Sequence, residues 1–305
     1  MSVLFEKICI IGTGLIGSSL ARNLREKGAV DRLTGVARSQ ENRDVMLANG
    51  IADEMHADAR FAVQNADCVV LCVPVGSMAG MVEKIKPFLK KGVILTDVGS
   101  VKARVVQEIL PLIDDTVEFV PAHPVAGTEK SGAANGFSSL FEGRYGIITP
   151  CGRAAPESVA KVRAMWELCG MKVEEMTSER HDTVMAVVSH LPHLIAYSIV
   201  ATAADMEEET RAEVIRYCAG GFRDFTRIAG SDPIMWRDIF LNNSQAVLDV
   251  LQRFNEDLTL LQKAIRKGDG AFLEKVFTRT RTIRRDVIDA KQAQTENEKI
   301  LLQKH

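Results

Sequence analysis

The sequence has no marked excess of charge of either sign. Its 305 residues include 38 lysines and arginines against 40 aspartates and glutamates, for a formal net charge of −2. Nucleic-acid-binding proteins need a strong basic excess, so we predict no nucleic-acid partner. One local basic run (Arg279, Arg281, Arg284 and Arg285) is interpreted as the solvated face of a helix. With 46% hydrophobic and 26% charged residues, the composition also excludes wholesale disorder.

Closely spaced cysteine pairs are missing as well. None of the six cysteines belongs to a C-x-x-C pair, and Cys9, Cys68 and Cys72 lie among isoleucine and valine. Free thiols in such surroundings behave as small hydrophobic side chains. The pattern is typical of a reducing compartment rather than of a disulfide framework.

The sequence also lacks a long uninterrupted apolar run. The longest, at residues 68–75, is far shorter than the roughly 20 residues that a membrane helix needs. No signal peptide is expected, because a strand is predicted almost at once, at residues 7–11. We therefore predict a cytoplasmic protein without a membrane segment.

The first half of the chain alternates short runs of β-branched residues with helical patterns. This alternation predicts βαβ units around a parallel sheet. Strands are expected at residues 7–11, 33–37, 69–73, 93–96, 118–120, 146–149 and 172–176, with helices at 15–27, 40–49, 77–89, 102–112 and 156–169.

Strand-like runs disappear after about Thr177. Helical periodicity predicts helices at residues 186–206, 207–219, 233–267 and 271–299. We therefore divide the chain into a domain at 1–176 and an all-helical domain at 177–305. Long helices with apolar stripes in only about 130 residues indicate burial against a partner chain, so a homodimer is expected.

A glycine motif follows the first predicted strand directly. Residues 12–17 read G-T-G-L-I-G, and they open the first predicted helix. In this context G-x-G-x-x-G predicts a Rossmann-type dinucleotide site: Gly12 permits the tight turn, Gly14 lets the backbone approach the pyrophosphate, and Gly17 lets the helix pack on the strand. The phosphates are expected at the helix N-terminus. The expected cofactor-binding residues of this motif are Gly12, Thr13, Gly14, Leu15, Ile16 and Gly17.

The end of the second strand indicates which dinucleotide binds. An NAD-binding chain usually has an acidic residue there, but this chain has Ala37, Arg38 and Ser39. Arg38 and Ser39 are suited to a 2′-phosphate, which favours NADP over NAD; the alternative is that Arg38 is an exposed loop residue. Val73 and Pro74, after the next strand, are expected to close over the cofactor.

Two polar loops follow later strands. Residues 97–102 read D-V-G-S-V-K, and residues 123–132 read H-P-V-A-G-T-E-K-S-G. Ligands of open α/β sheets bind outside the carboxyl ends of the strands, so both loops are expected to face the nicotinamide. His123 is then a base for a hydroxyl proton, oriented by Ser100. The alternative is a loop histidine whose hydrogen bonds are satisfied locally.

The helical half adds three polar segments: S-H-L-P-H at 189–193, G-G-F-R-D-F-T-R-I-A at 220–229 and S-D-P-I-M-W-R-D at 231–238. Arg223 and Arg227 are suited to grip an anionic substrate, although pairing with nearby aspartates is a competing interpretation. His190 and His193 have no suitable third ligand close by, so no metal site is expected.

Together these motifs resemble the prephenate/arogenate (cyclohexadienyl) dehydrogenase family of tyrosine biosynthesis, over residues 5–285. The resemblance implies an enzyme that oxidatively decarboxylates prephenate to 4-hydroxyphenylpyruvate, or arogenate to tyrosine, with hydride transfer to NAD(P). It also implies an intertwined dimer formed by the helical domain. Preference for prephenate or arogenate is left open, with a lean to prephenate.

The resemblance also implies roles for single residues. His123 matches the catalytic histidine and Ser100 the serine that positions it. His193 and Arg227 match substrate-binding residues, the arginine on a substrate carboxylate. Thr128 and Glu129 match residues at the mouth of the pocket, and Trp236 matches an aromatic that reaches the neighbouring subunit's site. Two alternative functions are considered. A β-hydroxyacid dehydrogenase or imine reductase of similar architecture would be expected to use a catalytic lysine in the helical domain. A non-catalytic nucleotide sensor would bind cofactor without turnover.

Overall fold

The computed structural model describes residues 3–128, 130, 132–206, 213, 216–217 and 219–289. The chain divides after Ser244 into two compact units. Each unit is described by itself below.

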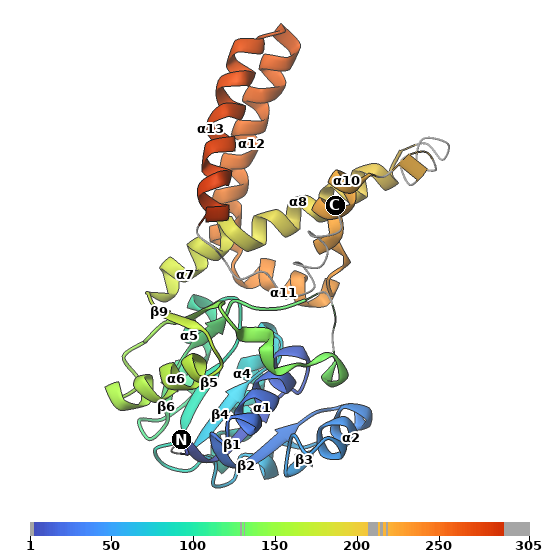
Figure 1. Ribbon diagram of the computed structural model, residues 1–305. Coiled ribbons are helices and arrows are strands. Elements are labelled where there is room, and N and C mark those ends of the chain that lie inside the picture. The colour runs from blue at the N-terminus through green and yellow to red at the C-terminus, as the bar shows by residue number, and fades with distance from the viewer. Residues whose placement is uncertain are drawn as a thin grey trace. The chain divides into compact units, whose positions relative to one another are not determined.

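A six-stranded parallel sheet forms the centre of the first unit (Figure 1). The strand order is β3-β2-β1-β4-β5-β6, so the direction of sheet growth reverses between β1 and β4. Ile11, at the end of β1, pairs with Val36 on one side and Leu71 on the other. The carboxyl ends of three strands therefore lie level at the switch point, where α/β folds bind ligands. The strands are β1 (Phe5–Ile11), β2 (Val30–Val36), β3 (Glu54–His56), β4 (Cys68–Leu71), β5 (Ile94–Asp97) and β6 (Glu118–Val120).

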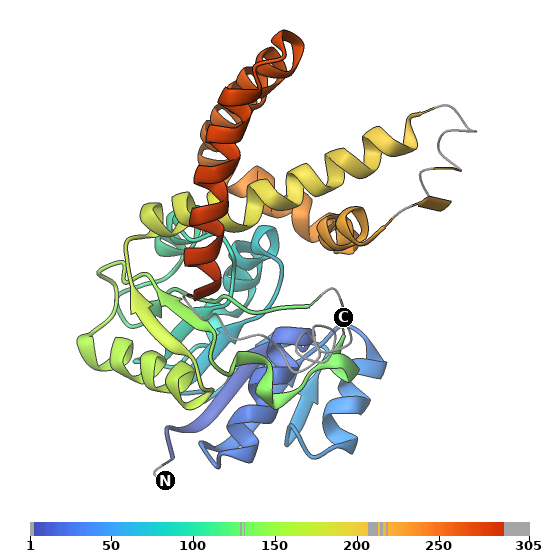
Figure 2. The same ribbon diagram turned by 45° about the horizontal axis from the view of Figure 1, so that its top comes forward.

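Helices cover both faces of this sheet (Figures 1 and 2). Side chains alternate along β1, so Ile8 and Ile10 enter one core and Cys9 and Ile11 the other. Both faces are apolar, which explains the continuous hydrophobic runs of the buried strands. The first core is completed by α1 (Leu15–Glu26), α2 (Gln40–Ala48) and α6 (Pro156–Leu168), and the second by α3 (Ala59–Ala62), α4 (Val75–Ile85) and α5 (Ala103–Ile109).

The prediction that the last two strands extend the parallel sheet is wrong. They form a second, three-stranded sheet, β7-β8-β9, in which β7 and β8 are antiparallel. Pro121 lies between β6 and β7 and has no amide hydrogen to continue the first ladder, whereas its carbonyl accepts from Thr149 N at 3.0 Å. The strands are β7 (Ala122–Pro124), β8 (Tyr145–Ile148) and β9 (Lys172–Glu175). Between β7 and β8, the 3-10 helices Ala133–Asn135 and Ser138–Phe141 lie on α1.

Helical structure begins earlier than predicted in the second half of the chain. α7 (Ser178–Met185), a π-helix (Ala186–His190) and α8 (Leu191–Ala204) follow one another without a break. Thr177 caps α7 by accepting from Arg180 N at 3.2 Å. The π turn ends just before Pro192, whose ring and missing N–H do not fit a regular α-helix interior.

The predicted single helix at 233–267 is also wrong. It consists of α11 (Pro233–Asn242) and α12 (Ser244–Lys267), interrupted at Asn243, which is buried and uses its side chain elsewhere. Asp232 caps α11 by accepting from Ile234 N and Met235 N at 2.8 and 2.9 Å. α10 (Gly220–Thr226) and the 3-10 helix Arg227–Gly230 precede it. The predicted helix at 207–219 lies largely outside the described residues.

The second unit contains most of α12 and α13 (Gly270–Asp289), which run side by side in opposite directions (Figures 1 and 2). The turn between them includes Gly268 at φ +66°, a conformation that favours glycine. The four arginines of the basic run are all exposed, in agreement with a solvated helix face. Of the predicted helix at 271–299, residues 290–299 lie outside the described part.

The two compact units do not coincide with the predicted domains. Among the described residues no strand occurs after β9, as the pattern predicted. The first unit nevertheless reaches Ser244, because Trp236 and Ile239 of α11 join the hydrophobic core of the sheet beside α4. The boundary after residue 176 stays a prediction.

One helical stretch is long and apolar enough to cross a membrane by length and composition alone. It is Ser178–Ala204, with a mean hydropathy of 1.7 in its most apolar window, 28% of which is buried. The stretch contains no long uninterrupted apolar run, because polar residues such as His181, Asp182 and His190 lie within it.

Candidate active site

The glycine motif forms the turn between β1 and α1. Gly12 has φ +97°, and a Cβ there would lie 2.4 Å from the Cys72 carbonyl oxygen, so only glycine fits. A Cβ on Gly17 would lie 2.1 Å from the Gly12 carbonyl oxygen, which shows how tightly α1 approaches the turn. Gly14, by contrast, has open space around its Cβ position and opens α1 without a side-chain cap. The turn therefore leaves the N-terminus of a 12-residue helix available to an anion.

The remaining residues of the motif complete this turn. Thr13 is buried, Ile16 is half-buried, and Leu15 joins the core. Val73 contacts the same turn, since its Cγ1 lies 3.2 Å from the Cβ position of Gly12, and Pro74 precedes α4 as its N-cap. The predicted cofactor residues from β1 and β4 thus lie together at the switch point.

The end of β2 has no carboxylate at residues 37–39. Ala37 is buried and Arg38 is exposed. Ser39 accepts from Asn42 N at 3.4 Å as the N-cap of α2, and the guanidinium of Arg43 donates to the Ala37 and Arg38 carbonyls at 2.6 and 2.9 Å. The loop is therefore held in shape by Arg43, while the side chain of Arg38 extends into solvent.

A fully buried ion pair fixes the loop after β5. Lys102 Nζ contacts the Asp97 carboxylate, and both side chains are 0% exposed. Lys102 also donates to the Ala122 carbonyl at 2.8 Å, and Asp97 accepts from Gly99 N at 2.8 Å and Ala122 N at 3.3 Å. The pair thereby joins the loop that carries Ser100 to β7, the strand that carries His123.

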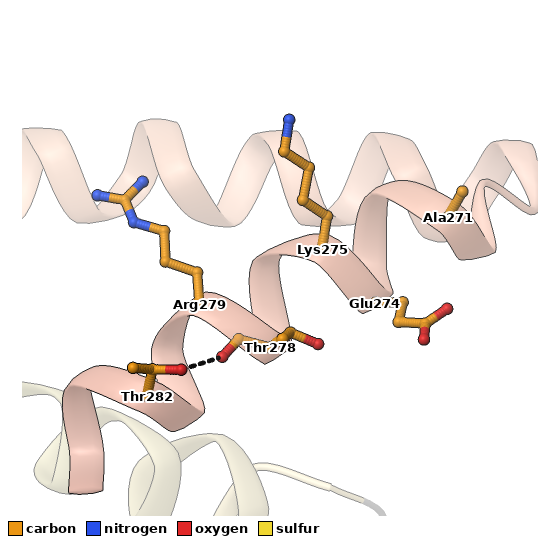
Figure 3. Close-up of a pocket in the computed structure, with 6 residues that line it drawn as sticks. All are labelled: Ala271, Glu274, Lys275, Thr278, Arg279 and Thr282. Carbon is orange, nitrogen blue, oxygen red and sulfur yellow. Dashed lines mark hydrogen bonds between the residues drawn. The ribbon is translucent and has the colours of Figure 1, made fainter.

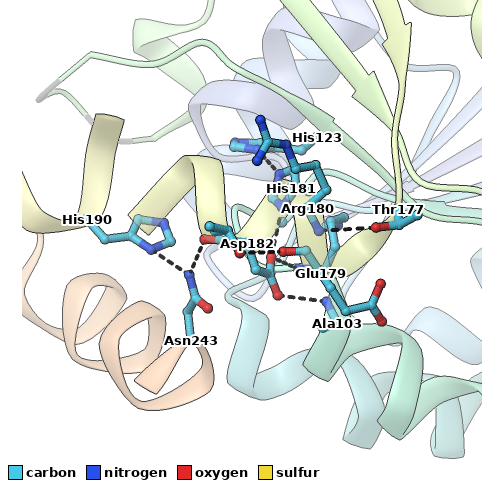
Figure 4. Close-up of polar contacts among 12 residues, drawn as sticks. Ala103, His123, Thr177, Glu179, Arg180, His181, Asp182, His190 and Asn243 are labelled. Carbon is cyan, nitrogen blue, oxygen red and sulfur yellow. Dashed lines mark hydrogen bonds and ion pairs between the residues drawn. The ribbon is translucent and has the colours of Figure 1, made fainter. Parts of the chain in front are cut away.

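His123 lies in a chain of buried polar side chains (Figure 4). Its Nδ1 is 2.8 Å from His181 Nε2, and His181 Nδ1 is 2.8 Å from Asp182 Oδ1. Burial, reinforced by the neighbouring His181 and Lys102, holds the pKa of His123 well below its usual range. Burial also lowers the pKa of His181, although Asp182 opposes the shift. Both imidazoles are therefore neutral at pH 7, and His123, at 8% exposure, retains access to a ligand.

Asn243 joins a third histidine to this chain (Figure 4). Its Nδ2 donates to the Asp182 carbonyl at 2.9 Å and lies 3.0 Å from His190 Nδ1. Burial lowers the pKa of His190 to about 4, and the Ser100 backbone lies close enough to oppose this shift. The break between α11 and α12 thus places Asn243 where it links His190 to the backbone of Asp182.

A second cluster surrounds His193. Its ring stacks on Trp236 with centroids 3.6 Å apart, and its Nδ1 donates to the Ser189 carbonyl at 2.8 Å. Burial lowers the pKa of His193, and the positive charge of Arg227 adds to the shift. Because Nδ1 donates to a carbonyl, Nε2 of the neutral ring is an acceptor.

The structure brings together most, but not all, of the predicted substrate residues. Ser100 is half-buried beside His190, and no hydrogen bond joins its hydroxyl to His123 among the described residues. Thr128 is exposed and accepts from Lys130 N at 3.2 Å. Glu129 lies outside the described residues. Trp236 contacts His190 and His193 of its own chain, so its predicted reach into a neighbouring subunit stays a prediction.

Sequence reasoning missed His181, Asp182 and Asn243. The adjacent letters H-D at 181–182 form no motif of fixed spacing, and Asn243 lay inside a predicted helix. The one available signal was the run N-N-S at 242–244, because asparagine and serine favour helix caps.

A shallow hollow on α13 contains none of these residues (Figure 3). It is lined by one face of one helix, and every lining side chain is exposed. Such a surface has no converging buried polar groups. The lining residues are Ala271, Glu274, Lys275, Thr278, Arg279 and Thr282.

Two family models cover most of the chain. Residues 20–175 match the nucleotide-binding domain of prephenate dehydrogenase, and residues 177–279 match its dimerization domain. The chain belongs to the prephenate dehydrogenase family. The predicted resemblance and the fold class, a Rossmann-type domain followed by a helical dimerisation domain, are thus confirmed.

Individual relatives support this family membership. The chain is 39% identical to cyclohexadienyl dehydrogenase of Zymomonas mobilis, over 92% of this chain and 95% of that one. It resembles prephenate dehydrogenase from A. aeolicus, solved with hydroxyphenyl propionate and NAD+, with 34% identity and a TM-score of 0.87 over 94% and 99% of the two chains. Synechocystis arogenate dehydrogenase gives 29% identity and a TM-score of 0.78 over 92% and 99%.

The family membership settles the class of protein. The chain is a dehydrogenase, an oxidoreductase that uses a nicotinamide dinucleotide. The alternative β-hydroxyacid dehydrogenase or imine reductase activity is not favoured by these relatives. The predicted enzyme class is confirmed, and the roles of single residues stay predictions.

Proposed function

We propose that this chain oxidatively decarboxylates prephenate to 4-hydroxyphenylpyruvate, or arogenate to tyrosine, with NADP favoured over NAD as the hydride acceptor. The observation that carries the proposal is His123, buried and neutral on β7, the strand that Lys102 joins to the loop of Ser100. A neutral imidazole has a lone pair that can accept a hydroxyl proton.

The reaction removes a hydride and a carboxylate from opposite carbons of the substrate ring. His123 Nε2 accepts the ring hydroxyl proton while hydride leaves the same carbon, and the C–O bond gains double-bond character. Loss of CO2 then returns the electron pair of the broken C–C bond to the ring, which becomes aromatic. The phenolate oxygen formed takes a proton back, and the imidazolium of His123 is placed to return it. The net reaction therefore releases CO2 and no proton.

Prephenate is a dianion, so its binding site needs cationic and donor groups. The charge of Arg227 acts on His193, and we assign this arginine to a substrate carboxylate, with the Nε2 of His193 as an acceptor for a substrate donor. Trp236 holds the His193 ring in place by stacking. Thr128 and Glu129 are assigned to the mouth of the pocket, as the resemblance implies.

The cofactor assignment uses the residues at the switch point. Residues 12–17 would hold the pyrophosphate at the N-terminus of α1, and Val73 with Pro74 would border it. When bound, the nicotinamide ring supplies the hydride acceptor. Arg38, exposed beyond β2 and without a neighbouring carboxylate at residues 37–39, is suited to a 2′-phosphate, with Ser39 beside it.

We also infer a homodimer in the cytoplasm, with the functional boundary between domains after residue 176. The family models, which meet between residues 175 and 177, support this boundary. The apolar surface of the Ser178–Ala204 stretch supports a partner chain: Val187, Val188, Ile199 and Val200 are exposed. A second copy covers this surface better than lipid does, because His181 and Asp182 of the same stretch are buried in polar contacts.

A four-way rate assay tests the function. Prephenate or arogenate is paired with NADP or NAD, and reduced cofactor is followed by absorbance. We expect turnover with at least one substrate, and faster turnover with NADP. Cofactor binding without turnover in all four mixtures would contradict the proposed reaction, and a preference for NAD would contradict the role of Arg38.

His123→Asn is the matched variant for this assay. We expect turnover to fall by at least about 100-fold, because a general base contributes 10²–10⁴-fold, while the cofactor dissociation constant stays within about threefold. Undiminished turnover in this variant would remove His123 from the chemistry. Arg38→Ala should reduce the NADP preference without reducing turnover with NAD.

A further inference from the structure

His181 connects His123 to a carboxylate that has no other access to it. His181 is 0% exposed, its Nε2 faces His123 Nδ1, and its Nδ1 faces Asp182 Oδ1, both at 2.8 Å. In this arrangement His123 is the base, and His181 and Asp182 are groups that can fix its tautomer.

The donor and acceptor on each ring nitrogen follow from Asp182. An ionised carboxylate only accepts hydrogen bonds, so His181 Nδ1 carries the proton. The Nε2 of a neutral His181 is then an acceptor, and His123 Nδ1 must donate to it. The remaining nitrogen of His123, Nε2, is left with a lone pair and has no partner among the described residues. The opposite tautomer of His181 would place a proton on His123 Nε2 and block it as a base.

Asp182 is itself held in one orientation. Its Oδ1 accepts from Lys102 N at 2.7 Å and its Oδ2 from Ala103 N at 2.9 Å, both at the start of α5. Other charged or titratable groups around His181 come from the loop after β5 (Asp97, Lys102), and His190 lies across Asn243. The Asp182 carboxylate thus accepts hydrogen bonds from two backbone amides and one imidazole, which together fix its orientation.

We propose that Asp182 and His181 are positioning residues that keep His123 in its Nδ1–H tautomer, so that Nε2 is available to take the hydroxyl proton of the substrate. The proposal rests on the proposed function for the identity of that proton, and it deepens it. When Nε2 takes the proton, His123 Nδ1–H donates to His181 more strongly, and Asp182 stabilises the positive charge through the shared hydrogen bonds.

The tautomer can be measured without substrate. In protein labelled with 15N at histidine, two-dimensional spectra distinguish a protonated ring nitrogen from one with a lone pair, and His123→Asn identifies the signals of His123 among the six histidines. We expect a protonated Nδ1 and an unprotonated Nε2 on His123 at pH 7.5, in the full chain. A protonated Nε2 with a free Nδ1 would overturn the proposal.

Asp182→Asn tests the origin of this tautomer. An amide in place of the carboxylate can donate to His181 and reverse both tautomers, a change that costs a Ser-His-Asp enzyme about 10⁴-fold in kcat. We expect kcat to fall at least about 100-fold, with KM and the cofactor dissociation constant within about threefold, and the His123 pattern to invert. Glu179→Gln, an exposed change on the same helix, is the matched control and should leave kcat unchanged. Asp182→Asn with kcat within threefold of the parent overturns the proposal.

A second pair of variants covers the case in which Asp182→Asn does not fold. His181→Gln retains an acceptor for His123 Nδ1–H, whereas His181→Leu has none. We expect the glutamine variant to keep kcat within about tenfold of the parent and the leucine variant to lose at least about 100-fold; equal losses overturn the proposal. If the parent turns over neither substrate but shows the expected His123 tautomer, the proposed function fails and the positioning role stands. If the parent turns over substrate normally but shows the opposite His123 tautomer, the proposed function stands and the positioning role fails.

Discussion

The buried pair of Lys102 and Asp97 offers a direct test of how the site is held. Lys102→Met keeps the length of the side chain but removes its charge and its three donors. The change removes the contact with the Asp97 carboxylate and the 2.8 Å hydrogen bond to the Ala122 carbonyl. Asp97 keeps its bonds from Gly99 N and Ala122 N.

The expected cost follows from the burial of both groups. Removing one partner of a buried ion pair leaves an uncompensated charge and typically costs 3–5 kcal/mol. Two backbone amides still solvate Asp97, so we expect the lower end, about 3 kcal/mol. At about 2–4 °C per kcal/mol for a chain of this size, the melting temperature should fall by at least about 6 °C.

The assay is a thermal melt at fixed protein concentration, so that any association is constant between variants. Lys91→Met, an exposed change, should leave the melting temperature within about 1 °C. Adding Asp97→Asn to Lys102→Met removes the unpaired charge and should recover at least half of the loss. A melting temperature within 2 °C of the parent for Lys102→Met, or no recovery in the double variant, would refute the reasoning.

Three further perturbations follow from the site. Gly17→Ala places a Cβ against the Gly12 carbonyl oxygen, so the folded state should lose about 1–3 kcal/mol of stability and melt at a lower temperature. Gly14→Ala has open space around its Cβ, so it should melt normally yet bind the cofactor more weakly in calorimetry. Arg227→Ala should raise KM about 10-fold or more at unchanged cofactor affinity, and an unchanged KM would reassign Arg227 to a structural contact. The pKa of His190 is about 4 in the folded chain and about 6.5 in the unfolded chain. The free energy of unfolding should therefore decrease as the pH is lowered from about 6.5 to about 4, by about 3 kcal/mol in full. Denaturant midpoints that do not decrease from pH 7 to pH 5 would contradict that assignment.

Apart from β3 and α3, which were not predicted, the half of the fold around the parallel sheet was predictable because its signals are local. Continuous β-branched runs indicate strands buried on both faces, and the glycines at 12 and 17 are required by close backbone contacts that the motif encodes. β7 was missed because it has three residues, one of which is proline, and its pairing with β8 crosses more than twenty residues. A short strand of this kind is specified by its partner and not by its own sequence.

The polar chain behind His123 was not predictable for a related reason. His123, His181 and Asn243 come from a strand, a helix and a helix break that are separated by about sixty residues each. No spacing rule joins them, since the contacts exist only once α7 has packed against the start of α5. The catalytic candidate was visible in the sequence, whereas the groups that set its protonation were visible only in the structure.

This arrangement also explains why α7, α8 and α11 belong to the same compact unit as the sheet. Asp182 uses its carboxylate on the first amides of α5 and its carbonyl on Asn243, so one residue fastens α7 to the sheet layer and to the end of α11. The burial that produces these contacts also keeps His123 and His190 neutral, and it therefore favours base chemistry near pH 7 at the expense of stability in acid. A variant that exposed His190 to water should lose less stability between pH 7 and pH 5, as denaturant midpoints at the two pH values would show, although it would also loosen the packing around His190.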